Sequence, residues 1–302
     1  MLSEVHAMTK FKRGTRQFWI PYLFLLPNVL IFALFVIIPA IQGLAMSFTD
    51  QGIFTEPKFV GFANFVELFH DEVFWITFKN TLVYSFLTVI MLVAVSLLLA
   101  LLLSKSTVKF EKGFRAAFYI PSLLSMITVG IAWRFILGDE MGIINYFLRS
   151  LGENGVPWLT DGTFAMLSVI MVTVWTYAGY YMLIFISGLQ AIPGELYEAA
   201  KVDGASPWYS FRKITIPLLA PTTLVVSILA TINAFKAYEL ITTMTKGGPG
   251  YATKFIVQQV YQVAFAEDRM GYASAMSIVL MLMIGAFTVF QFAANRGGSD
   301  NE

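Results

Sequence analysis

Six long stretches without a charged residue constrain this chain more than any other feature. Each is between 18 and 33 residues long, and a helix needs about 20 mostly apolar residues to cross roughly 30 Å of hydrocarbon. Only 13% of the residues are charged, against roughly 25% in an average soluble domain. The sequence therefore predicts an all-α polytopic membrane protein, with six transmembrane helices over residues 18–44, 80–103, 116–137, 164–189, 215–237 and 271–294.

Composition excludes several other classes of protein. A net charge of +1 provides no basic field for nucleic acid. The absence of cysteine excludes disulfides, iron–sulfur clusters and thiolate zinc sites. The two histidines, His6 and His70, are far apart in the sequence and do not suggest a metal site.

Lysine and arginine in the short flanking loops predict the orientation. Residues 1–16 and the loop 104–115 each carry four basic residues, whereas the segment between the first two spans is mainly acidic. We therefore expect a cytoplasmic N-terminal segment 1–16, one transmembrane domain over residues 17–295, and a cytoplasmic tail 296–302. The first apolar stretch is longer than the roughly 7–15 residues of a signal-peptide core, which favours a retained span over a cleaved signal.

The loop 191–213, which this orientation places in the cytoplasm, has the pattern of two short helices joined at a corner. Pro193 suits a first helical turn, and Asp203-Gly204 is a stop, because glycine adopts the left-handed cap conformation without steric cost. Ser206-Pro207 then restarts a helix as N-cap and first residue. Such a loop could be a simple connector. Alternatively, the small pair Ala199-Ala200 could lie in a groove of another protein.

This loop also carries the residues of a known family. The run Glu198-Ala199-Ala200-Lys201-Val202-Asp203-Gly204-Ala205, followed by Ile214-Thr215-Ile216-Pro217, resembles the EAA loop of bacterial ABC-importer permeases. Further segments resemble the carbohydrate-uptake branch of maltose, lactose and glycerol-phosphate permeases: Gly188-Leu189-Gln190-Ala191-Ile192-Pro193, Thr245-Lys246-Gly247-Gly248-Pro249, Gly61-Phe62-Ala63-Asn64-Phe65 and Trp158-Leu159-Thr160-Asp161. The resemblance covers roughly residues 20–295.

The resemblance implies a type I ABC importer permease fold in a bacterial cell membrane. It implies as partners a second homologous permease, two cytoplasmic ATPase subunits and an external solute-binding protein that delivers a carbohydrate. It also assigns contact with the ATPase to Glu198, Ala199, Ala200, Asp203, Gly204 and Ala205. The chain lacks a Gly-x-x-x-x-Gly-Lys-Ser/Thr loop, so we expect it to bind no cofactor, with ATP and magnesium on the ATPase subunits, and to be a transport subunit and not an enzyme.

A sugar path needs hydrogen-bonding and aromatic side chains at membrane depth, facing protein instead of lipid. Thr173, Thr176, Tyr177 and Tyr180 form one stripe at helical spacing and are the candidate lining of the fourth span. Packing between helices, or an interfacial aromatic belt, is the alternative. In the fifth span, Asn233 is the main candidate, since the family's permeases use this helix for their cavity. Lys236 and Glu239 are expected to form a local ion pair instead of binding substrate.

Other classes of function find less support. A secondary transporter or channel would need buried charged relays within its spans, and apart from the edge pair Lys236 and Glu239 the sequence has none. A membrane enzyme would need a nucleophile and a base, and no such motif is present. The solute stays open at this point, because a sugar, a polyol or a glycerol phosphate would need similar linings.

Overall fold

Three unbroken helices form the body of the bundle. The computed structural model describes residues 15–104 and 110–299, and its long helices are α4 (Glu72–Leu103), α8 (Gly162–Gln190) and α15 (Met270–Ser299). An aspartate caps the start of two of them, as expected where backbone N–H groups lack helical partners. Asp71 accepts from the N–H groups at the start of α4, and Asp161 does the same for α8. The all-α polytopic fold predicted from the sequence is thus observed.

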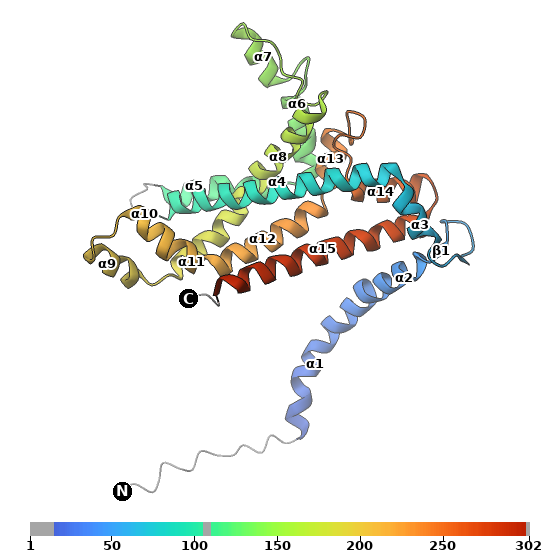
Figure 1. Ribbon diagram of the computed structural model, residues 1–302, viewed down its shortest axis with the longest axis horizontal. Helices are drawn as coiled ribbons and strands as arrows, with labels where there is room; N and C mark the ends of the chain where they lie inside the picture. The colour runs from blue at the N-terminus through green and yellow to red at the C-terminus, as the bar shows by residue number, and fades with distance from the viewer. Residues whose placement is uncertain (1–14, 105–109, 300–302) are drawn as a thin grey trace.

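The first apolar stretch lies apart from this body. α1 (Thr15–Phe32), a π-helical turn (Ala33–Ile37) and α2 (Ile38–Met46) form one continuous rod that leaves the bundle at an angle (Figure 1). None of the side chains in its most apolar window is buried. This rod therefore exposes an apolar surface to whatever surrounds the chain.

Two of the predicted spans are bent helix pairs and not straight helices. Predicted span 116–137 consists of α5 (Glu111–Tyr119), a 3-10 turn (Ile120–Leu123) and α6 (Met126–Ile136), bent by 98°. The bend follows Pro121, where Leu124 and Ser125 have extended backbone conformations and interrupt the helix. Among the residues that the structure describes, four helices are long and apolar enough to span a membrane, or up to six if each bent pair is one span.

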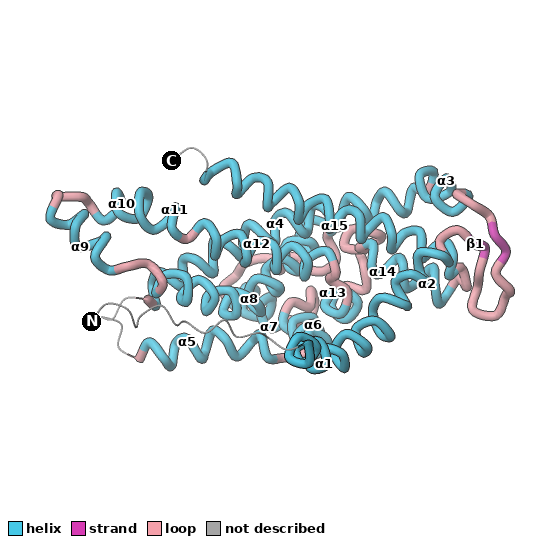
Figure 2. Tube along the Cα trace, turned by 90° about the horizontal axis from the view of Figure 1, so that it is seen from below, coloured by secondary structure: helices cyan, strands magenta, loops and turns pink. Residues whose placement is uncertain are grey.

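The second bent pair follows the loop 191–206. It consists of α10 (Pro207–Ser210), a π-helical turn (Phe211–Thr215) and α11 (Ile216–Leu218), followed by α12 (Ala220–Phe235) at an angle of 63°. The short helix α9 (Gly194–Val202) precedes it. Figure 2 shows α9 and α10 at one end of the bundle and β1 with α3 at the other; we call these the α9 end and the α3 end.

Short elements form the α3 end. Strands β1 (Thr49–Asp50) and β2 (Lys58–Phe59) pair antiparallel, with Thr49 opposite Phe59, and precede α3 (Ala63–His70). Arg269 forms a bidentate ion pair with Glu67 of α3, in which its two terminal nitrogens lie 2.8 and 2.6 Å from the two carboxylate oxygens. This hydrogen-bonded pair raises the pKa of the arginine. The remaining short helices are α7 (Ile143–Ser150), α13 (Glu239–Met244) and α14 (Ile256–Tyr261), the last continuing into a π-helical turn (Gln262–Ala266).

The main core lies where α4, α8 and α12 meet. Its largest fully buried side chains are those of Tyr84, Tyr181, Phe185 and Phe255, and each is at most 1% exposed. α5 approaches α8 closely at Gly179. The approach is so close that a side-chain carbon at this position would overlap the backbone carbonyl of Phe118. The crossing of α5 and α8 therefore depends on a residue without a side chain.

Candidate functional site

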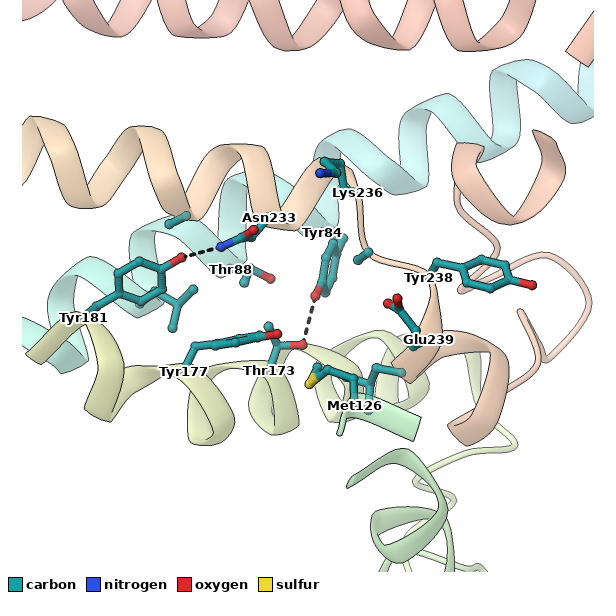
Figure 3. Close-up of a pocket in the computed structure, with 15 residues that line it drawn as sticks. Tyr84, Thr88, Met126, Thr173, Tyr177, Tyr181, Asn233, Lys236, Tyr238 and Glu239 are labelled. Carbon is teal, nitrogen blue, oxygen red and sulfur yellow. Dashed lines mark hydrogen bonds between the residues drawn. The ribbon is translucent and has the colours of Figure 1, made fainter. Parts of the chain in front are cut away.

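A cavity of about 240 Å³ lies between α4, α8 and α12, beside the start of α13. Figure 3 shows that its side chains come from both sides and point into a common space. Apart from apolar residues such as Met126, its lining is rich in tyrosine and in hydroxyl and amide groups. The polar and aromatic lining residues are Tyr84, Thr88, Thr173, Tyr177, Tyr181, Asn233, Lys236, Tyr238 and Glu239.

Two hydrogen bonds join helices across this cavity. The hydroxyl of Tyr84 on α4 lies 2.9 Å from that of Thr173 on α8. The Nδ2 of Asn233 on α12 donates to the hydroxyl of Tyr181 at 3.1 Å. These bonds fix the two tyrosine hydroxyls, while the rings themselves are buried in the protein, that of Tyr84 against Phe255. The Asn233 carbonyl is left for other contacts.

Thr88 places its hydroxyl in the cavity wall, beside the hydroxyl of Tyr84. Its side chain is fully buried, yet its Oγ1 has no hydrogen-bond partner in the part of the chain that the structure describes. Buried polar atoms are rarely left without a partner, since this costs about 1–3 kcal/mol. A hydroxyl group of a bound solute would satisfy it.

The structure brings together some of the predicted residues and not others. Thr173, Tyr177 and Asn233 line the cavity. Thr176 is fully buried, and its hydroxyl bonds to the carbonyl of Val172 within α8. Tyr180 is 38% exposed and lies outside the lining, against the ring of Tyr181.

Sequence reasoning missed Tyr84, Thr88 and Tyr181. The usable signal was a four-residue spacing, because residues 84 and 88 on α4 and residues 173, 177 and 181 on α8 repeat in this way. Side chains four apart lie on one helix face. The predicted stripe included residues 176 and 180, which turn away from the cavity instead.

The predicted ion pair between Lys236 and Glu239 is not observed. They form no ion pair in the described residues; both line the cavity. α12 ends at Phe235, and Tyr238 has a φ of −143°, so the two charged residues are not one helical turn apart. The helical geometry on which the predicted pair depended is therefore absent.

A second candidate site lies at the α9 end of the bundle. α9 ends in a left-handed glycine, Gly204, with a φ of 74°. The N–H of Ala205 bonds to the carbonyl of Ala200, and the N–H of Gly204 bonds to that of Lys201. These two bonds define a Schellman cap, and Ser206 then caps α10 by accepting from the N–H of Tyr209. The predicted corner is thus observed.

This corner is exposed over most of its surface. Glu198, Ala199, Asp203 and Gly204 are exposed, while Ala200 and Ala205 are half-buried. Val202, an apolar residue, is 87% exposed. A helix that leaves such residues in solvent has a surface suited to another protein.

Comparison with known proteins identifies the class. Residues 93–297 match the family described as "binding-protein-dependent transport system inner membrane component". The chain is 36% identical over 285 residues to a probable ABC transporter permease protein, YurN, of Bacillus subtilis, covering 93% of this chain and 97% of that one. It is 38% identical over 266 residues to the arabinooligosaccharides transport system permease protein AraP of Bacillus subtilis, covering 87% and 84%.

A solved structure agrees with these relatives. One chain of a crystal structure of a bacterial ABC transporter involved in alginate import matches with a TM-score of 0.82 and 27% identity, covering 93% of this chain and 96% of that one. The protein is therefore an ABC-importer permease by class, a membrane transport component and not an enzyme. It belongs to the binding-protein-dependent transport system inner membrane component family.

Proposed function

We propose that this chain is the permease subunit of a carbohydrate importer in a bacterial cell membrane, where it forms half of the path for the solute. The observation that carries the proposal is the exposed α9 corner, whose residues Glu198 to Ala205 match the EAA loop. The named relatives support a carbohydrate, since one is a permease for arabinooligosaccharides and another, from Thermoanaerobacterium thermosulfurigenes, a probable permease for starch degradation products.

Two features of the structure support a second, homologous permease as partner. The rod formed by α1 and α2 has no buried side chain in its most apolar window. Asn233 lines the cavity and is nevertheless exposed, so the cavity wall is open beside it. A neighbouring permease would close this wall and complete the path.

The remaining partners follow from the two ends of the bundle. Two ATPase subunits would hold ATP and magnesium, grip α9 of each permease, and place a basic group against Glu198. A solute-binding protein would deliver the sugar at the α3 end. Movement of α9 would then open the cavity alternately to the two sides of the membrane. This chain itself would bind no cofactor.

The cavity favours a neutral sugar over a glycerol phosphate. The half-buried ring of Tyr177 offers a flat face for a sugar ring, while Thr88 and Asn233 offer groups for its hydroxyls. The single cation in the lining, Lys236, is offset by Glu239 in the same lining. A dianionic phosphate would meet no net positive charge there.

Reconstitution in proteoliposomes tests the proposed function. The chain is assembled with a second permease, the ATPase subunits and a solute-binding protein of the same importer, and uptake of labelled oligosaccharides is measured. We expect uptake that requires ATP on the ATPase side and sugar-loaded binding protein on the other. Uptake by this chain alone, or uptake driven by a proton gradient without ATP, would contradict the proposal.

Thr88→Val should weaken sugar binding to the assembled complex about fivefold. The change removes one hydroxyl with little change in shape, and a hydrogen bond contributes about 1 kcal/mol. Thr176→Val is the matched control, since Thr176 is equally buried but its hydroxyl bonds within α8. Equilibrium binding of the transported sugar measures both, and equal affinities for the two variants would remove Thr88 from the site.

A further inference from the structure

We infer that the hydroxyl of Tyr197 transmits movement of α9 to the bent fifth span through its hydrogen bond with Thr215. The inference rests on the proposed function, because it concerns how an ATPase that grips α9 would move the cavity wall. It makes Tyr197 a positioning residue, which acts on the solute path through other groups.

The bond has an ordinary length and joins residues that are distant in the sequence. The Tyr197 hydroxyl lies 2.9 Å from Thr215 Oγ1, and the two residues are 18 apart in the sequence. Thr215 is only 5% exposed, so its position is fixed by the surrounding protein. Among the described residues, this is the one side-chain hydrogen bond or ion pair that joins α9 to another element.

A groove leaves α9 otherwise loosely attached. It has a volume of about 900 Å³ and separates α9 from the ends of α4 and α8. Tyr197 and Lys201 line it from α9, Leu101 from α4 and Leu189 from α8. An open groove provides few van der Waals contacts across it. α9 is therefore attached to the rest of the bundle mainly by its backbone connections and by the Tyr197–Thr215 hydrogen bond.

Thr215 is the residue through which a pull on α9 would reach the bend. It ends the π-helical turn Phe211–Thr215, two residues before Pro217, and the 63° bend to α12 follows at Leu219. π-helical turns interrupt the regular hydrogen-bond ladder and often mark functional sites. A force on Thr215 would therefore change the angle between α11 and α12.

α12 then leads directly to the cavity. It carries Asn233, whose amide donates to the hydroxyl of Tyr181 on α8 across the cavity. A change in the angle of α12 would move Asn233 relative to Tyr181. The route from α9 to the cavity therefore consists of two hydrogen bonds and one helix, with the bend as the element that changes shape.

Tyr197→Phe tests this inference in the reconstituted importer. We expect the number of sugar molecules imported per ATP hydrolysed to fall at least threefold, because the ring stays and the bond is lost. Binding of the ATPase should stay unchanged, since the exposed residues of α9 are the same. Tyr209→Phe is the matched control: Tyr209 lies on α10, is 56% exposed, and its hydroxyl makes no bond within the described residues.

Thr215 provides an independent second test. Thr215→Val should reduce the ratio as much as Tyr197→Phe, Thr215→Ser should keep it, and the double variant should be no worse than either single one. A normal ratio in Tyr197→Phe, or additive losses in the double variant, would overturn the inference while the proposed function stands. Failure of the wild-type complex to couple uptake to ATP would instead refute the proposed function and, with it, this inference.

Discussion

Gly204→Val abolishes ATP-driven uptake while the permease still folds and inserts: this is the expected result for the glycine at the α9 corner. Gly204 has a φ of 74°, where a side chain costs about 1–2 kcal/mol and a β-branched one more. A Cβ there would meet no neighbouring atom, so the strain comes from the backbone alone. The corner would relax to another conformation and α9 would change its direction.

Two variants act as controls for this prediction. Gly204→Asn should keep much of the uptake, since asparagine tolerates the left-handed conformation. Gly194→Ala, on the same helix, should keep nearly all of it, because Gly194 has no positive φ and no atom near its missing side chain. Transport and ATP hydrolysis are measured in proteoliposomes. Full uptake by Gly204→Val would show that the shape of this corner does not matter for coupling.

Gly179→Val should destabilise the folded permease by about 3 kcal/mol, the largest effect we expect on stability. A side-chain carbon at this position would overlap the backbone carbonyl of Phe118, and a backbone cannot move aside as a flexible side chain can. α5 and α8 would be forced apart beside the cavity. Thermal unfolding in detergent, followed by size-exclusion chromatography, measures the loss.

Gly285→Val is the matched control for Gly179→Val. Gly285 lies in α15 and has no atom within 4 Å of its missing side chain. The same change in residue type should therefore leave the unfolding temperature nearly unchanged. If both variants unfold at the wild-type temperature, α5 and α8 do not approach as closely at Gly179 as the structure indicates.

The α9 corner could be predicted from the sequence because its determinants are local. Gly204 needs only its own backbone angle, and Ser206 caps a helix that begins at the next residue. The spacing of charged residues likewise predicted where long apolar helices lie. These features depend on neighbours in the chain and not on distant contacts.

The bends and the cavity depend on distant contacts and were predicted only in part. Pro121 was visible in the sequence, but the 98° angle after it depends on how α5 packs against α8 and how α6 packs against α13. The lining face of α8 is set by Tyr84 and Asn233 on the neighbouring α4 and α12. Sequence periodicity did not distinguish Tyr180 from its neighbour Tyr181, so the prediction included Tyr177 and missed Tyr181.

The central claim is that α9 lies in the cytoplasm and binds a separate ATPase subunit. The natural chain has no cysteine, so Ala199→Cys places a single reactive thiol on the exposed face of α9. The direct measurement is the rate at which a membrane-impermeant maleimide labels this thiol in inside-out vesicles, with and without the ATPase subunits. We predict rapid labelling without them and strong protection with them. Labelling from the outside of intact cells, or equal rates in both kinds of vesicle, would contradict the account.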